Sequence, residues 1–366
     1  MENVNLKTKY KPAYTDEDAG LGFIFYIVIQ WIVVYVLRDL ISSGVPLTNL
    51  FYYIYAFLVE GVFALAVLVV CLIKKKSFVQ ASGLNKKVNI SLVGLCIGIS
   101  VVCLLGLGGG SDFFMQILEW LGYSSEGAGI QVTTFWELLI YTILIAAMPA
   151  FCEELLFRGL MQNALSKYGK HLSVFITAFS FMIMHGSPDQ TVHQFILGII
   201  FGYIVYYTGN LWLTIIIHFC NNFFVLVANF IYNISASGST ITDSAGAITQ
   251  GTNVGYQIVN YIISVVLVAI SVFLIYSAIK MIVKNNKELN GVPEHVSEGD
   301  RKRFGILDQV NVSEETSGEV VVCKVSGQEL NVNAKPKMSY IAIVLLSAAN
   351  VYLIIEWILA LIEGLS

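Results

Sequence analysis

Long apolar segments separated by short polar ones dominate this sequence. A helix needs about 20 mainly apolar residues to cross a bilayer, with roughly 17 to 25 tolerated. The candidate segments are Leu21–Leu37, Phe51–Ile73, Val88–Leu107, Phe135–Ala164, Leu172–Met184, His193–Tyr207, Leu211–Ile234, Tyr256–Ile279 and Tyr340–Ile362. The pattern therefore predicts an all-α, polytopic membrane bundle of about eight to nine transmembrane segments.

Two of these segments, Leu172–Met184 and His193–Tyr207, are shorter than a bilayer requires. They are joined by Gly186–Val192, in which glycine and proline end the helix. Irregular backbone at membrane depth is tolerated only where it is buried in protein or lines a cavity. We therefore expect a half-spanning helical hairpin beside a cavity. A further amphipathic piece, Phe113–Leu121, is expected to lie on the surface.

Composition agrees with the hydropathy pattern. Hydrophobic residues make up 56% of the chain and charged residues 13%, and the mean hydropathy is +0.73. Ordinary soluble domains carry about 25% charged residues, so a soluble protein is excluded. The six cysteines form no CxxC pair, and five of them lie in apolar segments. We interpret them as small hydrophobic residues rather than as a disulfide framework.

The basic residues are distributed unevenly along the chain, and cytoplasmic loops of membrane proteins collect lysine and arginine. With the N-terminus inside, all of the 21 Lys and Arg residues except Arg38 fall on the inner side. The loops 108–134 and 235–255 contain neither residue type. We expect a multi-pass protein of the cell membrane, with the N-terminus and the loop 285–338 in the cytoplasm. The polar first 20 residues do not resemble a signal peptide.

The same pattern divides the chain into regions. They are a three-helix membrane region 1–134, a core 135–232, an outer loop and helix 233–284, a polar cytoplasmic loop 285–338 and a C-terminal helix 339–366. Within the polar loop, Glu319–Val325 favours a strand, with a hairpin turning at Ser326–Gly327. The loop is too short for a core of its own. A docking or regulatory role is the alternative to a plain connecting loop.

Adjacent carboxylates interrupt the fourth apolar segment at Glu153 and Glu154. Ionisable residues at membrane depth are costly and usually mark a functional site. Glu154 and Arg158 are four residues apart, so they share a helix face and can pair. Glu153 then points about 100° away around the helix. The alternative is a structural ion pair at a helix end.

Two later segments each contribute an imidazole. His185 follows the apolar run Phe181–Met184, and His218 lies four residues before Asn222 in a spanning helix. A capping role for His185 and a helix-bridging role for the other two are the structural alternatives. At a rise of about 1.5 Å per residue, Glu153, His185 and His218 all reach the middle-to-cytoplasmic part of the bilayer. They can therefore meet.

This set of residues supports two chemistries. In the first, Glu153 is a general base for water, His185 orients that water, and His218 and Asn222 donate hydrogen bonds to an oxyanion. In the second, Glu153, His185 and His218 bind a zinc ion that acidifies the water. The sequence contains neither the HExxH motif of zinc proteases nor the GxSxG motif of serine hydrolases. No cofactor is certain, and zinc is the candidate.

The motifs together resemble those of the CPBP intramembrane proteases. This family includes CAAX prenyl protease 2, bacteriocin-processing and self-immunity proteins of the Abi group, and lysostaphin-resistance-protein-like domains. The motifs are Glu153-Glu154-x-x-x-Arg158, Phe181-x-x-x-His185, Gly198-x-x-x-Gly202, Thr208-Gly209-Asn210-Leu211-Trp212 and His218-x-x-x-Asn222. They cover roughly residues 135 to 230.

The resemblance implies an all-helical membrane core whose site opens to the cytosol. It implies Glu153 as the catalytic base, His185 as the residue that positions water, and His218 with Asn222 as the oxyanion hole. Glu154 and Arg158 would be supporting residues. Gly198 and Gly202 fit close helix packing.

The leading hypothesis is therefore an intramembrane endopeptidase that cleaves a membrane-associated peptide or protein. The bilayer is the other partner, and no nucleic acid is expected. A non-enzymatic scaffold or bacteriocin self-immunity protein is the main alternative. A proton-coupled transporter is a third hypothesis, but it would predict paired repeats with broken helices, and we find no second copy of the motifs.

Overall fold

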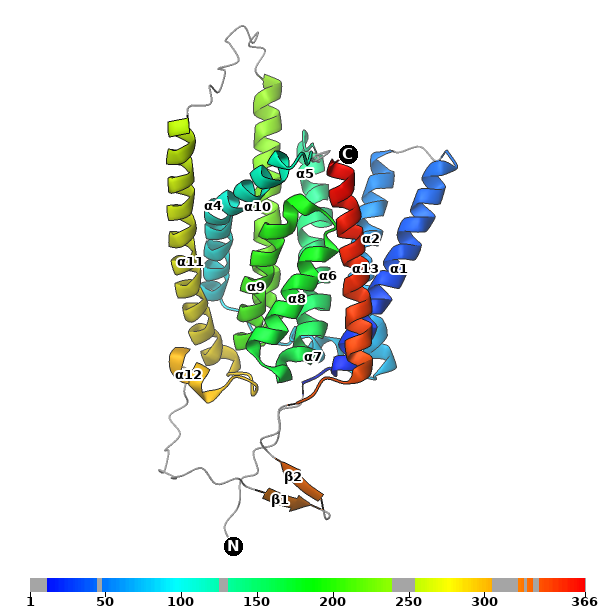
Figure 1. The fold of residues 1–366 in the computed structure, drawn as a ribbon, viewed down its shortest axis with the longest axis vertical. Helices are drawn as coiled ribbons and strands as arrows, with labels where there is room; N and C mark the ends of the chain where they lie inside the picture. The colour runs from blue at the N-terminus through cyan, green and yellow to red at the C-terminus, as the bar shows by residue number, and fades with distance from the viewer. Residues whose placement is uncertain are drawn as a thin grey trace.

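The computed structural model describes residues 12–44, 48–124, 131–238, 254–304, 322–325, 328–331 and 336–365. Within these ranges the chain forms a helical bundle with one small hairpin beside it (Figure 1). The elements are α1 Asp16–Ser42, α2 Asn49–Ile73, α3 Phe78–Ala81, α4 Ile90–Trp120, α5 Phe135–Tyr141, η1 Thr142–Ala147, α6 Met148–Glu154, η2 Leu155–Gln162, α7 Asn163–Leu165, η3 Ser166–Tyr168, α8 Lys170–Met184, η4 Pro188–Gln190, α9 Thr191–Thr208, α10 Leu211–Gly238, α11 Val254–Asn290, α12 Glu298–Phe304, β1 Val322–Val325, β2 Gln328–Asn331 and α13 Tyr340–Leu365.

The predicted polytopic bundle is confirmed. Among the described residues, 7 helices are long and apolar enough to cross a membrane. Two shorter apolar helices, Ile90–Gly106 and Lys170–Met184, match the remaining predicted segments. The antiparallel strands β1 and β2 flank residues 326–327, where the sequence predicts a hairpin turn. These strands lie outside the bundle (Figure 1).

Two details of the prediction are wrong. The second arm of the hairpin is not half-spanning, because the turn η4 and α9 together form a 21-residue segment that is long enough to cross. The piece Phe113–Leu121 is not a separate surface helix, because α4 runs without a break from Ile90 to Trp120. A helix in a bilayer must satisfy its own backbone hydrogen bonds, which explains why α4 continues through the glycines at 108–110.

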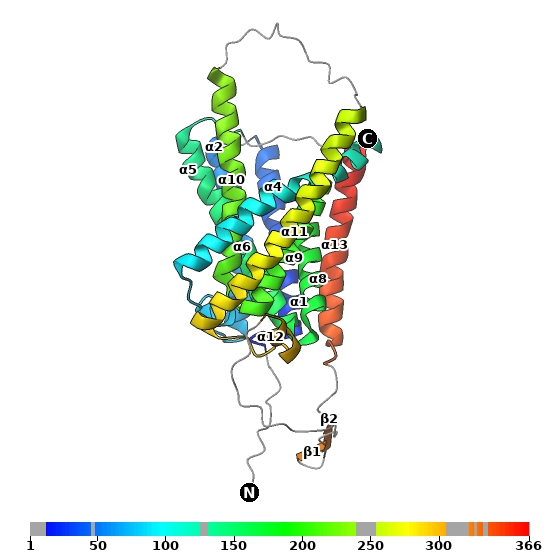
Figure 2. The ribbon, with the colours of Figure 1, turned by 90° about the vertical axis from the view of Figure 1, so that its left-hand side faces the viewer.

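The helices pack around two hydrophobic cores. The first is built from α1, α2, the helix containing Glu153, α8 and α13, and includes Phe23, Phe63 and Phe157. The second is built from α4, α9, α10 and α11, and includes Phe201 and Ile282. Figure 2 shows α4 and α11 running obliquely side by side along one edge of the bundle. The glutamate helix therefore lies inside the bundle, with packed helices on both sides.

The Phe135–Tyr168 helix changes its winding around Glu153. The wider π-helical stretches η1 and η2 flank the short α-helix α6. Such stretches are frequent at functional sites. Pro149 in the first turn of α6 has no N–H to donate to the carbonyl of Ile145. That carbonyl instead accepts a hydrogen bond from Asn222 Nδ2 at 3.2 Å, so the proline couples this helix to α10.

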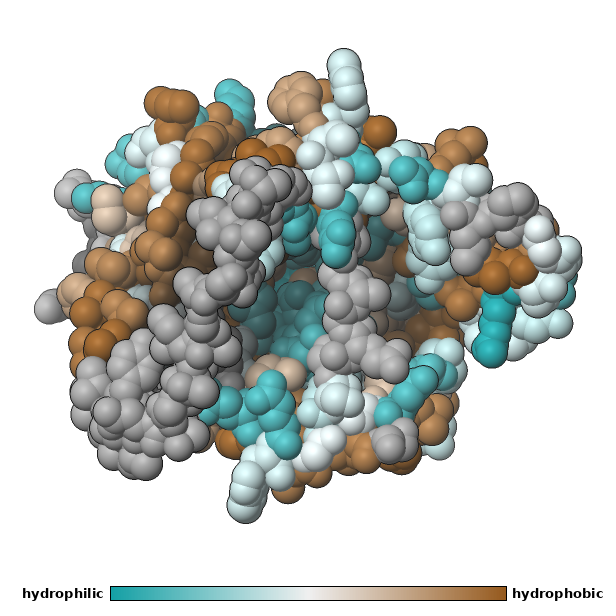
Figure 3. Space-filling view, turned by 90° about the horizontal axis from the view of Figure 1, so that it is seen from above, coloured by the Kyte–Doolittle hydropathy of each residue, from teal (hydrophilic) through white to brown (hydrophobic). Residues whose placement is uncertain are grey.

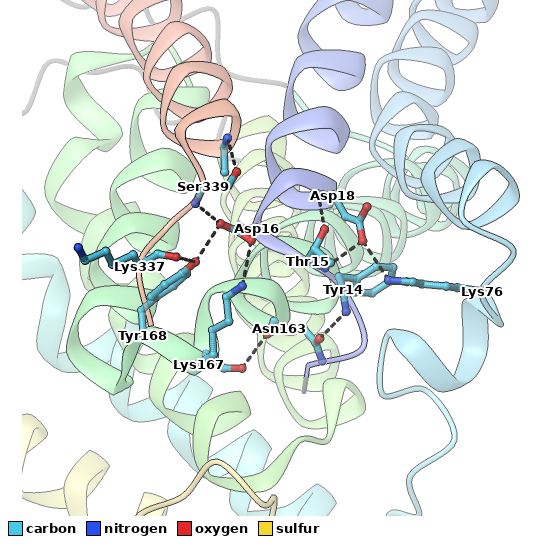
Figure 4. Close-up of polar contacts among 12 residues, drawn as sticks. Tyr14, Thr15, Asp16, Asp18, Lys76, Asn163, Lys167, Tyr168, Lys337 and Ser339 are labelled. Carbon is cyan, nitrogen blue, oxygen red and sulfur yellow. Dashed lines mark hydrogen bonds and ion pairs between the residues drawn. The ribbon is translucent and has the colours of Figure 1, made fainter. Parts of the chain in front are cut away.

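A polar cluster fixes the end of the bundle nearest the N-terminus (Figure 4). Asp16 accepts hydrogen bonds from Lys167 Nζ at 2.9 Å, Tyr168 Oη at 2.8 Å and the Ser339 N–H at 2.7 Å. Asp18 accepts from Lys76 Nζ at 2.9 Å. We call this group the Asp16 cluster. It joins the start of α1 to the end of the Phe135–Tyr168 helix and to the start of α13.

Candidate active site

A cavity of about 610 Å³ lies between α4, the Phe135–Tyr168 helix, the α8–α9 turn and α10. Its polar lining comes from Ser111, Glu153, His185, Asp189, Gln190, His193, Gln194, His218, Asn221, Asn222 and Asn229. Four of the six residues singled out in the sequence, Glu153, His185, His218 and Asn222, thus share one cavity. The other two, Glu154 and Arg158, lie directly behind it.

The two adjacent glutamates have different surroundings. Glu154 is fully buried, and its Oε1 accepts a hydrogen bond from Arg158 Nη1 at 2.8 Å. Glu153 faces the cavity. This is the division predicted from the four-residue spacing. Arg158 holds the Glu154 carboxylate in place, whereas the Glu153 carboxylate faces the cavity and any ligand in it.

Arg158 is enclosed on all sides. Its guanidinium lies 4.3 Å from the ring centre of Phe181 and 5.2 Å from that of Phe201. Its Nη2 also donates to the carbonyl of Gly198 at 3.4 Å. Cation–π contacts in a desolvated setting are worth about 2 kcal/mol. Glu154, the two aromatic rings and the Gly198 carbonyl thus surround this buried cation in place of water.

His218 bridges the two carboxylates. Its Nδ1 lies 3.4 Å from Glu154 Oε1, and its Nε2 lies 3.9 Å from Glu153 Oε2. The ring packs on Phe201, with 5.6 Å between ring centres. Nδ1 of the imidazole thus contacts the Glu154–Arg158 pair, while Nε2 reaches the cavity beside Glu153.

His185 lines the same cavity from the end of α8. Its Nδ1 lies 2.8 Å from the carbonyl of Phe181. Because a carbonyl can only accept, Nδ1 carries the proton, and Nε2 of the neutral ring is an acceptor. The cap at the C-terminus of α8 therefore also sets the chemical form that His185 presents.

Asn222 reaches the cavity from α10 next to His218. One hydrogen of its Nδ2 is directed to the carbonyl of Ile145, as described above. Its Oδ1 accepts from Asn221 Nδ2 at 3.4 Å. Since the amide carries two N–H donors, the second is available to a ligand. Asn222 thus has both an anchoring bond and a donor to offer.

The cavity extends from Glu153 away from the N-terminal end of the bundle. Ser111 lies near the far end of α4, Val132 precedes α5, and Asn229 lies in the second half of α10. Figure 3 looks onto this far face and shows a hollow lined with hydrophilic residues. The buried half of the Phe135–Tyr168 helix closes the opposite end, at which α1 begins.

The matched family agrees with the resemblance. Residues 135–224 match the family model described as "Type II CAAX prenyl endopeptidase Rce1-like". We call this stretch the Rce1-like domain because of that similarity. It contains all six residues from Glu153 to Asn222 that carry the motifs. No curated protein and no solved structure matches the chain. The apolar helices make this a multi-pass membrane protein, and residues 135–224 are similar to a protease family.

Sequence reasoning missed several polar residues of the cavity in and around the Rce1-like domain. Asn221 is adjacent to Asn222. Asn229 lies seven residues after Asn222, two helical turns along the same face of α10. A search for polar residues at helical spacing along α10 would have found both. His193 lies in the first turn of α9, which begins at Thr191, and lines the cavity wall. Asp189 and Ser111 carry no signal in the sequence.

A zinc ion would need several His, Cys, Asp or Glu side chains that point to one position. Among the described residues, no group of three or more His, Cys, Asp and Glu side chains is arranged to hold a metal ion. His218 lies between the two glutamates, with its Nδ1 3.4 Å from Glu154 Oε1 and its Nε2 3.9 Å from Glu153 Oε2. Glu153, His185 and His218 therefore do not fit a shared zinc ion as they stand.

Proposed function

We propose that this protein is an intramembrane endopeptidase that hydrolyses a peptide bond of a membrane-associated peptide or protein. The observation that carries the proposal is the pairing of Glu153 with His218 in one cavity, with Glu154 and Arg158 behind them. The Rce1-like match supports the same reaction class. We assign the catalytic core to residues 135–232.

The first step is the attack of water on the scissile carbonyl. Glu153 accepts a proton from the water, while His185 Nε2 accepts a hydrogen bond from the other water hydrogen and so aims the oxygen. The oxygen adds to the carbonyl carbon, and the carbonyl oxygen becomes an oxyanion. Asn222 Nδ2–H and His218 Nε2–H donate to that oxyanion.

The second step breaks the C–N bond. Glu153 returns its proton to the departing nitrogen, and the oxyanion collapses to a carboxyl group. The products are a new C-terminal carboxyl group, which keeps the second water hydrogen, and a new N-terminal amine; transfer of that hydrogen between them gives carboxylate and ammonium, so both protons of the water are accounted for. No group other than the chain and the water is required.

Glu154 and Arg158 act as positioning residues. Glu154 accepts from His218 Nδ1, and Arg158 holds Glu154 in place. For His218 to donate from Nε2 to the oxyanion and from Nδ1 to Glu154, this mechanism requires a proton on both ring nitrogens. Buried charges persist when they are paired and hydrogen-bonded in this way.

The test uses the purified full-length chain in liposomes with quenched membrane-anchored peptides, one of them carrying an isoprenylated C-terminus. We expect Glu153→Gln to lower the cleavage rate by about 100-fold or more, as loss of a general base does. Glu356→Gln is the matched control, because Glu356 is an exposed acid of α13 outside the cavity. Cleavage by Glu153→Gln at the original rate would contradict the assignment.

A measurement with a chelator tests whether cleavage requires a metal ion. We expect a strong chelator to leave the cleavage rate unchanged, because the glutamate and histidines do not converge on one point. Loss of activity that returns on addition of zinc would restore the metal hypothesis.

A further inference from the structure

The two ends of the bundle differ in charge. Among the described residues, Lys and Arg gather at the end nearest the N-terminus, at the C-terminal ends of α2 and α11, before α4, around the α7–α8 corner and on α12. Arg38 lies at the opposite end of α1, and Arg158 is buried inside. Since basic loops remain in the cytoplasm, the N-terminal end is the cytoplasmic one.

The cavity is closed toward that basic end. Every residue from Cys152 to Gln162 is buried. Arg158 fills the space behind Glu153, and Gln162 Nε2 donates to the carbonyl of Gly202 at 2.6 Å. The part of the glutamate helix between Glu153 and the cytoplasmic end is thus packed against its neighbours, which leaves no room for a peptide.

The cavity is open toward the other end. From Glu153 and His218 it runs past Asn222 to Val132 and Asn229. Figure 3 shows this face from outside, with the hydrophilic hollow at its centre. A substrate that reaches Glu153 therefore enters from the end that carries few basic residues.

The rim of the opening is built to hold an extended backbone. Residues 131–133 form neither helix nor turn. The N–H of Val132 donates to Asn229 Oδ1 at 3.1 Å, and its carbonyl accepts from Asn233 Nδ2 at 3.1 Å. Asn229 and Asn233 thus bind both backbone polar groups of one extended residue. Asn221 and Gln194 bring further amide groups to the cavity, where one N–H of each is used by Asn222 Oδ1 and Gln190 Oε1.

We infer that this cavity takes its substrate from the non-cytoplasmic side of the membrane. The substrate class is an extended polypeptide beside its membrane anchor on that side, rather than a lipid-modified cytoplasmic tail. The cleavage itself rests on the proposed function, whereas the side of entry rests on the charge distribution and on the cavity.

Thiol labelling tests the side of entry independently of activity. In a Cys323→Ser background, the five remaining cysteines are buried. Gln190→Cys places a thiol at the cavity rim, and Lys302→Cys places one on exposed α12 as the matched control. With a membrane-impermeant maleimide, we expect Gln190→Cys to label fully in intact cells and Lys302→Cys only after lysis. The reverse result would overturn the inference.

The substrate class is tested with two libraries of single-span reporter proteins. Each carries a randomised segment beside the span, on the non-cytoplasmic side in one library and as a prenylated cytoplasmic tail in the other. We expect release from the first library only, and none with Glu153→Gln. Release from the cytoplasmic library would overturn the inference but keep the protease. Release from neither would overturn the substrate class, and with an inactive purified protein it would contradict the proposed function as well.

Discussion

Glu153 and Glu154 carry the same side chain at adjacent positions, yet substituting them should have different consequences. Glu154→Gln leaves Arg158 buried without its charge partner, which typically costs about 3 to 5 kcal/mol. We expect a clearly lower unfolding temperature in detergent for Glu154→Gln and a nearly unchanged one for Glu153→Gln. Thermal unfolding followed by intrinsic fluorescence measures both, and equal temperatures would show that the pair does not hold the site together.

Asn222 has two tasks, and one substitution should affect both. Asn222→Ala removes a donor to the oxyanion, and such losses lower kcat by about 100- to 1,000-fold. It also leaves the Ile145 carbonyl without its partner, at a cost of about 1 to 3 kcal/mol. Cleavage kinetics and thermal unfolding should therefore change together. Glu356→Gln is the control here as well, because Glu356 is exposed on α13 and lies outside the cavity. A kcat unchanged by Asn222→Ala would remove Asn222 from the oxyanion hole.

The sequence predicted the separate positions of Glu153 and Glu154, because helical spacing alone decides which carboxylate meets Arg158. It also predicted that His185 and His218 meet Glu153. It could not predict the bond from Asn222 to Ile145, since that bond depends on how Pro149 distorts a helix distant in sequence. The orientation of His185 likewise depends on a backbone carbonyl, which no residue type reveals.

The contact between α8 and α9 depends on glycine. A Cβ at Gly198 would lie 2.9 Å from Ala178 Cα, and backbone cannot move aside as a flexible side chain can. We expect Gly198→Ala to separate the two helices, to weaken the bond from Arg158 to the Gly198 carbonyl and to cost about 1 to 3 kcal/mol.

Gly98→Ala is the matched control for this substitution. Nothing lies within 4 Å of a Cβ at Gly98, and alanine is the better helix former by up to about 1 kcal/mol. Thermal unfolding should therefore show Gly198→Ala below the parent protein and Gly98→Ala at or above it. The opposite order would mean that α8 and α9 are not in close contact.

Hydropathy predicted the elements well, because the bilayer requires both apolar length and internal backbone bonding. It placed all the membrane helices but missed the contribution of the η4 turn and the continuity of α4. Polar and glycine residues interrupt the apolar pattern at both places, although the backbone there stays helical or nearly so. The pattern of apolar residues indicates which segments contact lipid, but it does not show where the helical backbone begins and ends.

At the scale of the whole molecule, the segment after α11 returns to the end of α9. His295 Nε2–H donates to the carbonyl of Tyr206 at 2.7 Å. Burial lowers the pKa of His295, and the hydrogen bond to Tyr206 only partly opposes this. The docked ring therefore stays neutral at a pH near 6.5, at which a free imidazole, with a pKa of about 6.5, takes up a proton.

This difference in proton binding makes the stability of the fold depend on pH. Below about pH 6.5 the unfolded chain binds a proton that the docked ring does not, so stability falls as the pH is lowered. We expect the unfolding temperature to decline from pH 7 toward pH 5, and His295→Gln to reduce that decline. A slope identical in both proteins would mean that His295 does not contribute.

The positions of the helices in the bundle also bear on its assembly, since α1 packs against α13, from which every other described helix separates it along the chain. Trp357 Nε1 of α13 donates to Thr191 Oγ1 at 3.0 Å, beside the turn that borders the cavity. As the chain is made, the face of α1 that meets α13 is therefore covered only after all the helices between them have been synthesised. The order in which the helices enter the membrane thus differs from the order in which they lie beside one another in the bundle.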